Sequence, residues 1–114
     1  MEPYVINIER ETIRNDAYRR VLFTTKDQQL VLMSLQPGED IPAETHSGTQ
    51  FIRIEKGIAL AQINNFDYLL EDGDSITIPP DTLHYIKNLS NGDLKLYTLY
   101  CPPEHKEGEY QLRQ

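Results

Sequence analysis

The chain has 114 residues, a formal net charge of −7 and ordinary shares of hydrophobic (39%) and charged (25%) residues. This length is that of one domain, since domains typically run to about 100–150 residues, and the composition excludes a disordered or fibrous chain. The excess of acidic groups repels nucleic-acid phosphates, so we expect no nucleic-acid partner. The sequence therefore predicts a single domain over residues 1–114.

The first elements along the chain bear on compartment and local structure. The start, Met1–Tyr4, lacks the basic region and apolar core of a signal peptide, and no apolar run approaches the roughly 20 residues of a membrane helix. Residues 8–20 are the best helical candidate, but their apolar positions are too sparse for a period of 3.6, so we predict an irregular or extended segment. The one cysteine, Cys101, is typical of a reducing compartment, and we expect a cytoplasmic protein without membrane contact.

After this segment, short stretches rich in Ile, Val, Leu, Tyr and Thr alternate with turn sequences, which is typical of an all-β sandwich or barrel. The predicted strands are Arg19–Thr24, Gln29–Leu35, Phe51–Lys56, Ile58–Asn64, Phe66–Leu70, Ser75–Ile78, His84–Asn88 and Leu94–Tyr100. Turns are predicted at Pro37–Asp40, Asn64-Asn65, Glu71–Asp74 and Ser90–Asp93. The polar tail, residues 102–114, is expected on the surface.

The segment Leu30–Leu35 is apolar on both faces, whereas a strand with one face in water alternates. The outward side chains of Phe51 and Ile58 also need cover. A partner subunit is the usual cover for a barrel of this size, so the sequence predicts a homodimer.

Four polar residues in or next to these strands offer nitrogen or oxygen donors that divalent metals accept. Glu44 and His46 lie two residues apart and share one face of an extended segment. Gln50 returns to that face after the bend at residues 47–49, and His84 begins a later strand after Pro79-Pro80. We expect these side chains to converge inside the barrel.

The spacing around these residues resembles the two motifs of the cupin family. The first motif is matched by Gly38, five residues, Glu44-Thr45-His46, three residues, Gln50, six residues and Gly57. The second motif is matched by Gly73, five residues, Pro79-Pro80-Asp81, two residues, His84, three residues and Asn88. The resemblance implies a double-stranded β-helix, or jelly-roll barrel, with its motif core at residues 38–88. It also implies one divalent ion (zinc, manganese, nickel or iron) held by Glu44, His46, Gln50 and His84.

The chain departs from the family pattern at three positions. Glu44 stands where the first histidine is usual, Gln50 where a glutamate is usual, and Asp81 where the second motif has its middle glycine. The formal charge of the donor set stays at −1, which indicates a rearranged site. The wider resemblance is to small single-domain RmlC-like cupins, often described as mannose-6-phosphate isomerase-like, and it implies a fold and a site without an assigned reaction.

Three functions remain open at this point. The first is a metal-dependent enzyme acting on a small oxygen-rich metabolite such as a sugar or sugar phosphate, in the manner of an isomerase, with Glu44 also a candidate base. The second is a dioxygenase, since two histidines and one carboxylate form the donor set of non-haem Fe(II). The third is a non-catalytic module that binds a small ligand.

Purely structural roles are the alternative to these functions. The four polar side chains could hydrogen-bond one another in a metal-free cupin, and Gln50 could lie outside the ligand set, next to a true ligand. His105, in the polar tail, is expected in solvent, with a tail folded over the barrel mouth as its alternative.

Overall fold

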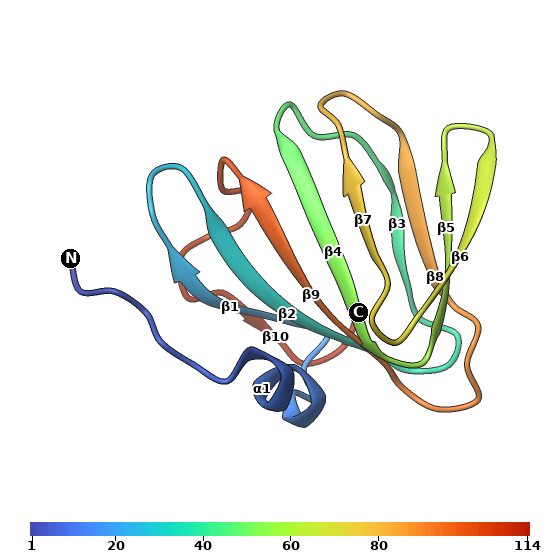
Figure 1. Cartoon of the computed structure of the whole chain (residues 1–114), viewed down its shortest axis with the longest axis horizontal. Helices are drawn as coiled ribbons and strands as arrows, with labels where there is room; N and C mark the ends of the chain where they lie inside the picture. Colours follow the sequence, from blue (N-terminus) through green and yellow to red (C-terminus); the bar gives the residue numbers. More distant parts are fainter.

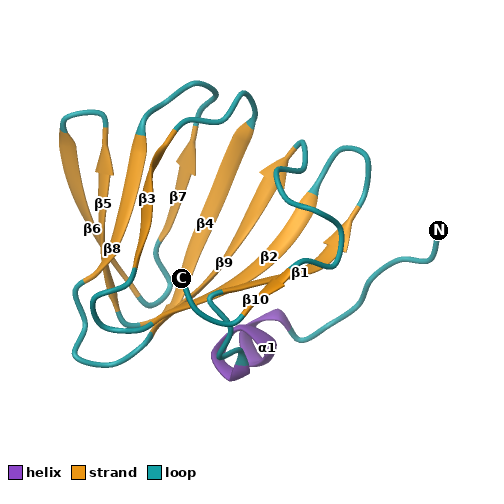
Figure 2. Cartoon of the chain, turned by 180° about the vertical axis from the view of Figure 1, so that it is seen from behind, coloured by secondary structure: helices purple, strands orange, loops and turns teal.

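The eight predicted strands, together with strands at Asp40–Glu44 and Tyr110–Gln111 that the sequence did not predict, form two antiparallel sheets that face each other, as the computed structural model of residues 1–114 shows (Figures 1 and 2). The six-stranded sheet has the order β10-β1-β2-β9-β4-β7 and the four-stranded sheet the order β3-β8-β5-β6. The element bounds are α1 Ile8–Arg14, β1 Arg19–Thr24, β2 Gln29–Leu35, β3 Asp40–Glu44, β4 Thr49–Lys56, β5 Ile58–Ile63, β6 Phe66–Glu71, β7 Ser75–Ile78, β8 His84–Asn88, β9 Leu94–Cys101 and β10 Tyr110–Gln111. Strands distant in sequence pair with each other, as β2 does with β9, so the fold is the predicted jelly-roll sandwich.

The inner faces of the sheets carry the core, and polar side chains gather at one end of it. Alternation along β2 and β9 turns residues such as Val31 and Leu96 inward, where both are fully buried. The buried polar residues Gln29, Gln50 and His84 lie instead at or near the starts of β2, β4 and β8, which share one end of the sandwich, the upper end in Figure 1. This end of the interior can therefore hold polar chemistry, whereas the rest is mainly apolar, with Asn88 buried near the opposite end and hydrogen-bonded to the carbonyl of Leu35.

The prediction of an irregular or extended segment after residue 7 is wrong, because Ile8–Arg14 forms helix α1. Asn7 caps the helix, and its side-chain oxygen accepts a hydrogen bond from the N–H of Arg10 at 3.0 Å. The helix packs on the outer face of β9 and β4. Its buried residue is the polar Thr12, so the helix has no apolar stripe from which the sequence could reveal it.

A buried lysine attaches the helix to the sheet. The Nζ of Lys95 donates to the carbonyl of Asn15 at 2.6 Å and to the hydroxyl of Ser34 at 2.9 Å. The N–H of Ser34 also donates to the carbonyl of Ala17 at 3.0 Å. At this end of β2 the chain itself covers the second face, so this part of the strand gives no argument for a partner subunit.

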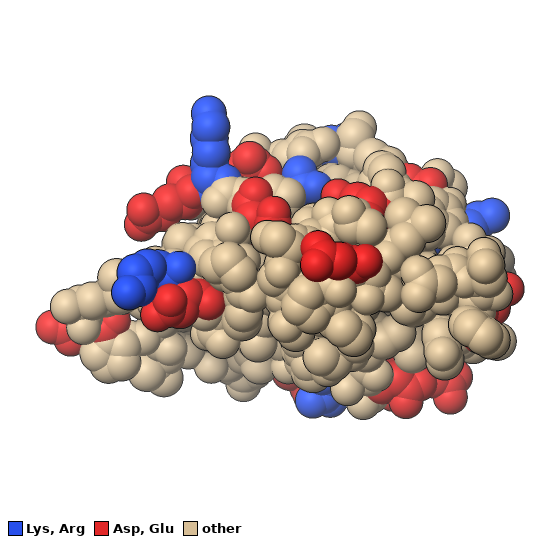
Figure 3. Space-filling view, turned by 90° about the horizontal axis from the view of Figure 1, so that it is seen from above, with Lys and Arg blue, Asp and Glu red and all other residues tan.

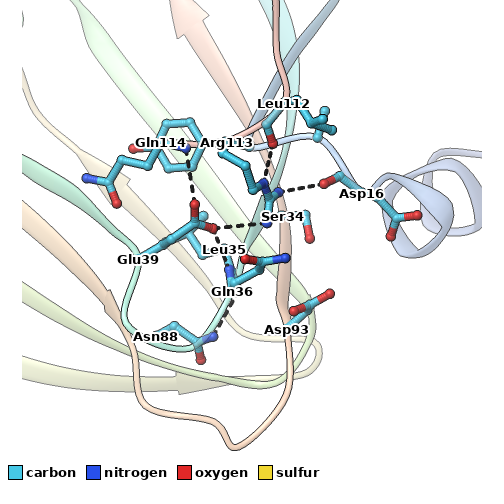
Figure 4. Close-up of polar contacts among 12 residues, drawn as sticks. Asp16, Ser34, Leu35, Gln36, Glu39, Asn88, Asp93, Leu112, Arg113 and Gln114 are labelled. Carbon is cyan, nitrogen blue, oxygen red and sulfur yellow. Dashed lines mark hydrogen bonds and ion pairs between the residues drawn. The ribbon is translucent and has the colours of Figure 1, made fainter.

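The tail folds back onto the sandwich and forms β10, a short strand that the sequence did not predict. Strand β10 pairs with β1, and Arg113 near the chain end contacts Glu39 at 3.4 Å. The guanidinium of Arg113 also donates to the carbonyl of Asp16, and the N–H of Gln114 donates to Glu39 (Figure 4). These contacts fix the C-terminal end of the segment between β9 and β10.

Acidic side chains are spread over the face seen from above, with fewer basic ones between them (Figure 3). This distribution agrees with the net charge of −7. The structure contains no helix long and apolar enough to span a bilayer.

Candidate metal centre

Two neighbouring strands and one loop bring the first three site residues together. Glu44 ends β3 and lies directly opposite His84, the first residue of β8. His46 follows in the loop between β3 and β4, where its carbonyl accepts a hydrogen bond from the N–H of Asp81 at 2.7 Å. Asp81 has a positive φ of 58°, so this turn residue, which stands in place of a usual glycine, adopts the conformation that a glycine would favour.

The ligand atoms of these residues are close enough for one ion. The Oε1 of Glu44 lies 3.2 Å from the Nε2 of His46 and 3.8 Å from the Nε2 of His84. All three atoms lie within 4.8 Å of one another. Two atoms bound to one ion at about 2.1 Å can be up to about 4.2 Å apart, so the carboxylate oxygen can share an ion with either imidazole.

Each histidine ring has a nitrogen without a hydrogen bond on the side of the Glu44 carboxylate. The Nε2 atoms of His46 and His84 are buried and have no hydrogen-bond partner, and a buried polar atom without a partner is costly. The opposite nitrogens do face oxygens: the Nδ1 of His84 lies 3.0 Å from the carbonyl of Thr82, and that of His46 lies 3.5 Å from Glu104. The carbonyl of Thr82 favours a proton on the Nδ1 of His84 and a lone pair on its Nε2, which is the form that binds a metal. The ring of His46 has a carboxylate on each side, Glu104 beside Nδ1 and Glu44 beside Nε2.

Gln50 lies on the inner face of β4 and is fully buried. Its Nε2 donates to the hydroxyl of Thr98 at 3.1 Å, whereas its Oε1 is buried without a partner. The oxygen is thus available as a neutral donor. Ligation of an ion by Gln50 stays a prediction.

Sequence reasoning missed the residues that surround the site on the side of β9. The ring of Tyr100 meets that of His46 edge-on at 5.4 Å and that of His105 at 5.2 Å. Burial raises the pKa of Tyr100, so its hydroxyl stays neutral. Inward alternation of Tyr100 on β9 was the available signal, but no pattern in the sequence indicated Glu104 beside His46.

The expectation that His105 lies in solvent is wrong. Its side chain is only 19% exposed, since the folded tail packs the ring against Tyr100. Burial lowers the pKa of His105, the charge of Arg19 lowers it further, and Glu109 opposes both effects. The tail therefore belongs to the wall of the site.

Access to the centre is from the side of Glu44. Its side chain is 41% exposed, whereas those of His84 and His46 are 1% and 11% exposed. A small molecule could reach the carboxylate from this side, with both imidazole Nε2 atoms buried behind it. The centre can therefore combine an ion with an oxygen-bearing ligand.

The spacing of the donor residues and the two-sheet fold agree with a match to a family model, "Cupin domain", over residues 31–100. The chain belongs to the cupin family. Within it, the chain is similar to the mimivirus protein L612 of Acanthamoeba polyphaga mimivirus, with 49% identity over 97% of the chain and 72% of that protein. It is 40% identical to YrkC of Bacillus subtilis over 94% of the chain, which spans 61% of the length of YrkC.

The solved structure of BH2720 from Bacillus halodurans superposes on this cupin with a TM-score of 0.96. The two share 42% of their sequence over 98% of this chain and 90% of that one. This agreement extends over the strands outside the motif core, so the whole chain has the architecture of a cupin.

Proposed function

We propose that this cupin binds one divalent metal ion through Glu44, His46 and His84, with Gln50 as a fourth ligand. The observation that carries the proposal is the pair of buried, unpartnered histidine Nε2 atoms beside one carboxylate oxygen. A neutral imidazole and a carboxylate are strong donors for late first-row metals, and an amide oxygen is a weak one. We propose further that the bound ion serves a small oxygen-rich metabolite such as a sugar or sugar phosphate.

We propose an isomerisation of the mannose-6-phosphate isomerase-like kind as the reaction. A bound divalent ion supplies Lewis-acid chemistry that polarises a carbonyl or binds adjacent hydroxyls. Glu44 is the residue of the triad most open to solvent, so it is our candidate base. Tyr100 keeps its proton and can donate a hydrogen bond close to His46.

Two other functions use the same residues. Two histidines and one carboxylate are the donor set of Fe(II) oxygenases, and this set favours a dioxygenase as the second candidate. Consumption of O2 by the Fe(II)-loaded protein with a substrate would distinguish it from an isomerase. Ligand binding without turnover or O2 consumption would indicate the third candidate, a binding module.

The test of metal binding compares the untagged protein with the Glu44→Ala, His84→Ala double variant. We expect elemental analysis to find close to one equivalent of a divalent metal in the natural chain and little in the variant. Equal metal contents in the two proteins would overturn the proposed site. A panel of aldose and ketose phosphates, assayed for interconversion, then tests the isomerase proposal separately.

The proposal includes a cytoplasmic homodimer. Support for the dimer comes from the edge strand β6, where Phe66 and Leu69 are each 68% exposed, although an edge strand normally avoids large apolar side chains. The lone cysteine is in keeping with a reducing compartment. Light scattering at tens of micromolar is expected to give twice the chain mass of 13.2 kDa, and the mass of one chain would contradict the dimer.

A further inference from the structure

The segment Pro102–Glu109 is held against the site end of the sandwich by a buried amide. Gln29 of β2 is fully buried, and its Oε1 accepts from the N–H groups of Glu104 at 3.2 Å and His105 at 3.0 Å. Its Nε2 donates to the carbonyl of His105 at 2.8 Å. The oxygen and the nitrogen of this one buried amide thus both fix the backbone of the segment. The backbone in turn sets the direction of the Glu104 side chain.

The fixed backbone places the carboxylate of Glu104 beside a metal-ligand histidine. The Oε2 of Glu104 lies 3.5 Å from the Nδ1 of His46, on the side of the ring opposite to Glu44. Both side chains are partly shielded from water, with 25% of Glu104 and 11% of His46 exposed. Shielding strengthens the interaction of the carboxylate with a ring N–H.

The two site histidines are held in different ways. The Nδ1 of His84 faces a backbone carbonyl, that of Thr82, which no substitution of a side chain removes. The Nδ1 of His46 lies 3.5 Å from a side-chain oxygen, the Oε2 of Glu104, which a substitution does remove. The C-terminal segment therefore contacts the metal centre through His46, whereas the partner of the His84 ring does not belong to this segment.

We propose that Glu104 is a positioning residue for the metal centre, whose carboxylate accepts the Nδ1–H of His46 and keeps the Nε2 of that ring directed toward Glu44. This inference rests on the proposed metal site. A carboxylate that receives the second ring N–H of a metal-bound histidine fixes the tautomer and makes the ring a better donor. The loss of such a partner weakens metal binding by about 10–100-fold.

The first experiment is a competition titration with Zn²⁺ on the full chain. We expect Glu104→Ala to weaken binding by about 10–100-fold and Glu104→Gln to weaken it less, because the amide oxygen still accepts. Glu107→Gln is the matched control, since Glu107 is exposed in the same segment and is expected to leave the affinity unchanged. Affinities of both Glu104 variants within twofold of the natural protein would overturn the proposal.

The second readout is independent of metal. In the metal-free protein, imidazole nitrogen NMR reports how the ring protons are shared between Nδ1 and Nε2. Removal of the carboxylate beside Nδ1 leaves Glu44 beside Nε2, so Glu104→Ala should move proton occupancy of His46 toward Nε2. His84 should keep its pattern, because its Nδ1 partner is unchanged.

These readouts separate the two proposals. If the natural protein binds no Zn²⁺ but His46 responds to Glu104→Ala, the metal site fails and the contact with Glu104 stands. An unchanged His46 signal would overturn the positioning role whatever the metal titration shows. Where the alanine variant fails to fold, the glutamine variant decides, since it keeps the size and one acceptor oxygen of the side chain.

Discussion

Replacement of Lys95 by methionine is expected to lower the free energy of unfolding by about 2–4 kcal/mol, by the following estimate. Its Nζ donates to the carbonyl of Asn15 at 2.6 Å and to the hydroxyl of Ser34 at 2.9 Å, and the side chain is 6% exposed. Hydrogen bonds from a charged group are worth about 1.5–3 kcal/mol each, which gives about 3–6 kcal/mol for the pair. Methionine offsets part of this loss of stability, because the variant no longer buries an ammonium group.

The ion pairs of Lys95 add little to this estimate. Asp16, at 3.1 Å, has a side chain that is 87% exposed, and Asp93, at 3.8 Å, is 39% exposed. Water screens such pairs, which typically contribute between zero and about 1 kcal/mol. Asp16→Asn should therefore change stability far less than Lys95→Met, although both remove a charge from the same contact.

Urea denaturation followed by circular dichroism measures these differences. Lys87→Met is the matched control, since Lys87 is an exposed lysine in the middle of β8, and it should leave the midpoint nearly unchanged. The affinity for Zn²⁺ should also be unchanged in Lys95→Met, because Lys95 pairs with Ser34 at the end of β2 remote from Gln29. A loss below about 1 kcal/mol for Lys95→Met, less than one ordinary charged hydrogen bond, would refute this account of how α1 is attached.

Three further outcomes are expected. His84→Ala should weaken Zn²⁺ binding more than Gln50→Ala in a calorimetric titration, because imidazole is the stronger donor; an equal loss, or a larger one for Gln50→Ala, would contradict this order. Burial lowers the pKa of His105 from its ordinary 6.5, so as the pH falls through 6.5 the unfolded chain takes up the proton first and the free energy of unfolding declines. His105→Gln should remove that part of the decline between pH 8 and 5. An unaltered dependence of stability on pH in this variant would refute the prediction. A Cβ on Gly48 would clash with the carbonyl oxygen of Cys101, so Gly48→Ala should cost about 1–3 kcal/mol in denaturation. An unchanged midpoint would contradict this and show that the loop can shift without loss of stability.

Eight of the ten strands were predictable because alternation with a period of two marks them. Strand β3 was missed, and His46 lies in the loop after it, where strand alternation does not apply. The spacing between the two cupin motifs indicated that His84 lies close to Glu44, and in the register of β3 and β8 these two residues are directly opposite each other. The motif spacing indicated Glu44, His46 and His84, which the structure brings together, and Gln50 lies on the inner face as alternation requires.

Helix α1 and the tail were not predictable, because tertiary contacts decide their structure. The buried face of α1 holds Thr12, and its attachment depends on Lys95 far along the chain. Strand β10 has only two residues, and Arg19 helps to hold it through a hydrogen bond to Gln111 at 2.9 Å. The position of Glu104 depends likewise on Gln29, and no local pattern encodes such a pair.

The exchange of acidic and neutral residues within the donor set has a physical consequence. The family pattern has a glutamate at position 50, where this chain has a glutamine that is 1% exposed and bonded to Thr98. A carboxylate there would be buried and would depend on an ion for compensation. At position 44 the carboxylate is 41% exposed and remains hydrated without one. The rearrangement therefore moves the negative charge of the donor set from the buried wall to the rim, where water compensates it, so we expect the metal-free protein to remain folded, as circular dichroism after treatment with a chelator would test; loss of the folded spectrum would contradict this.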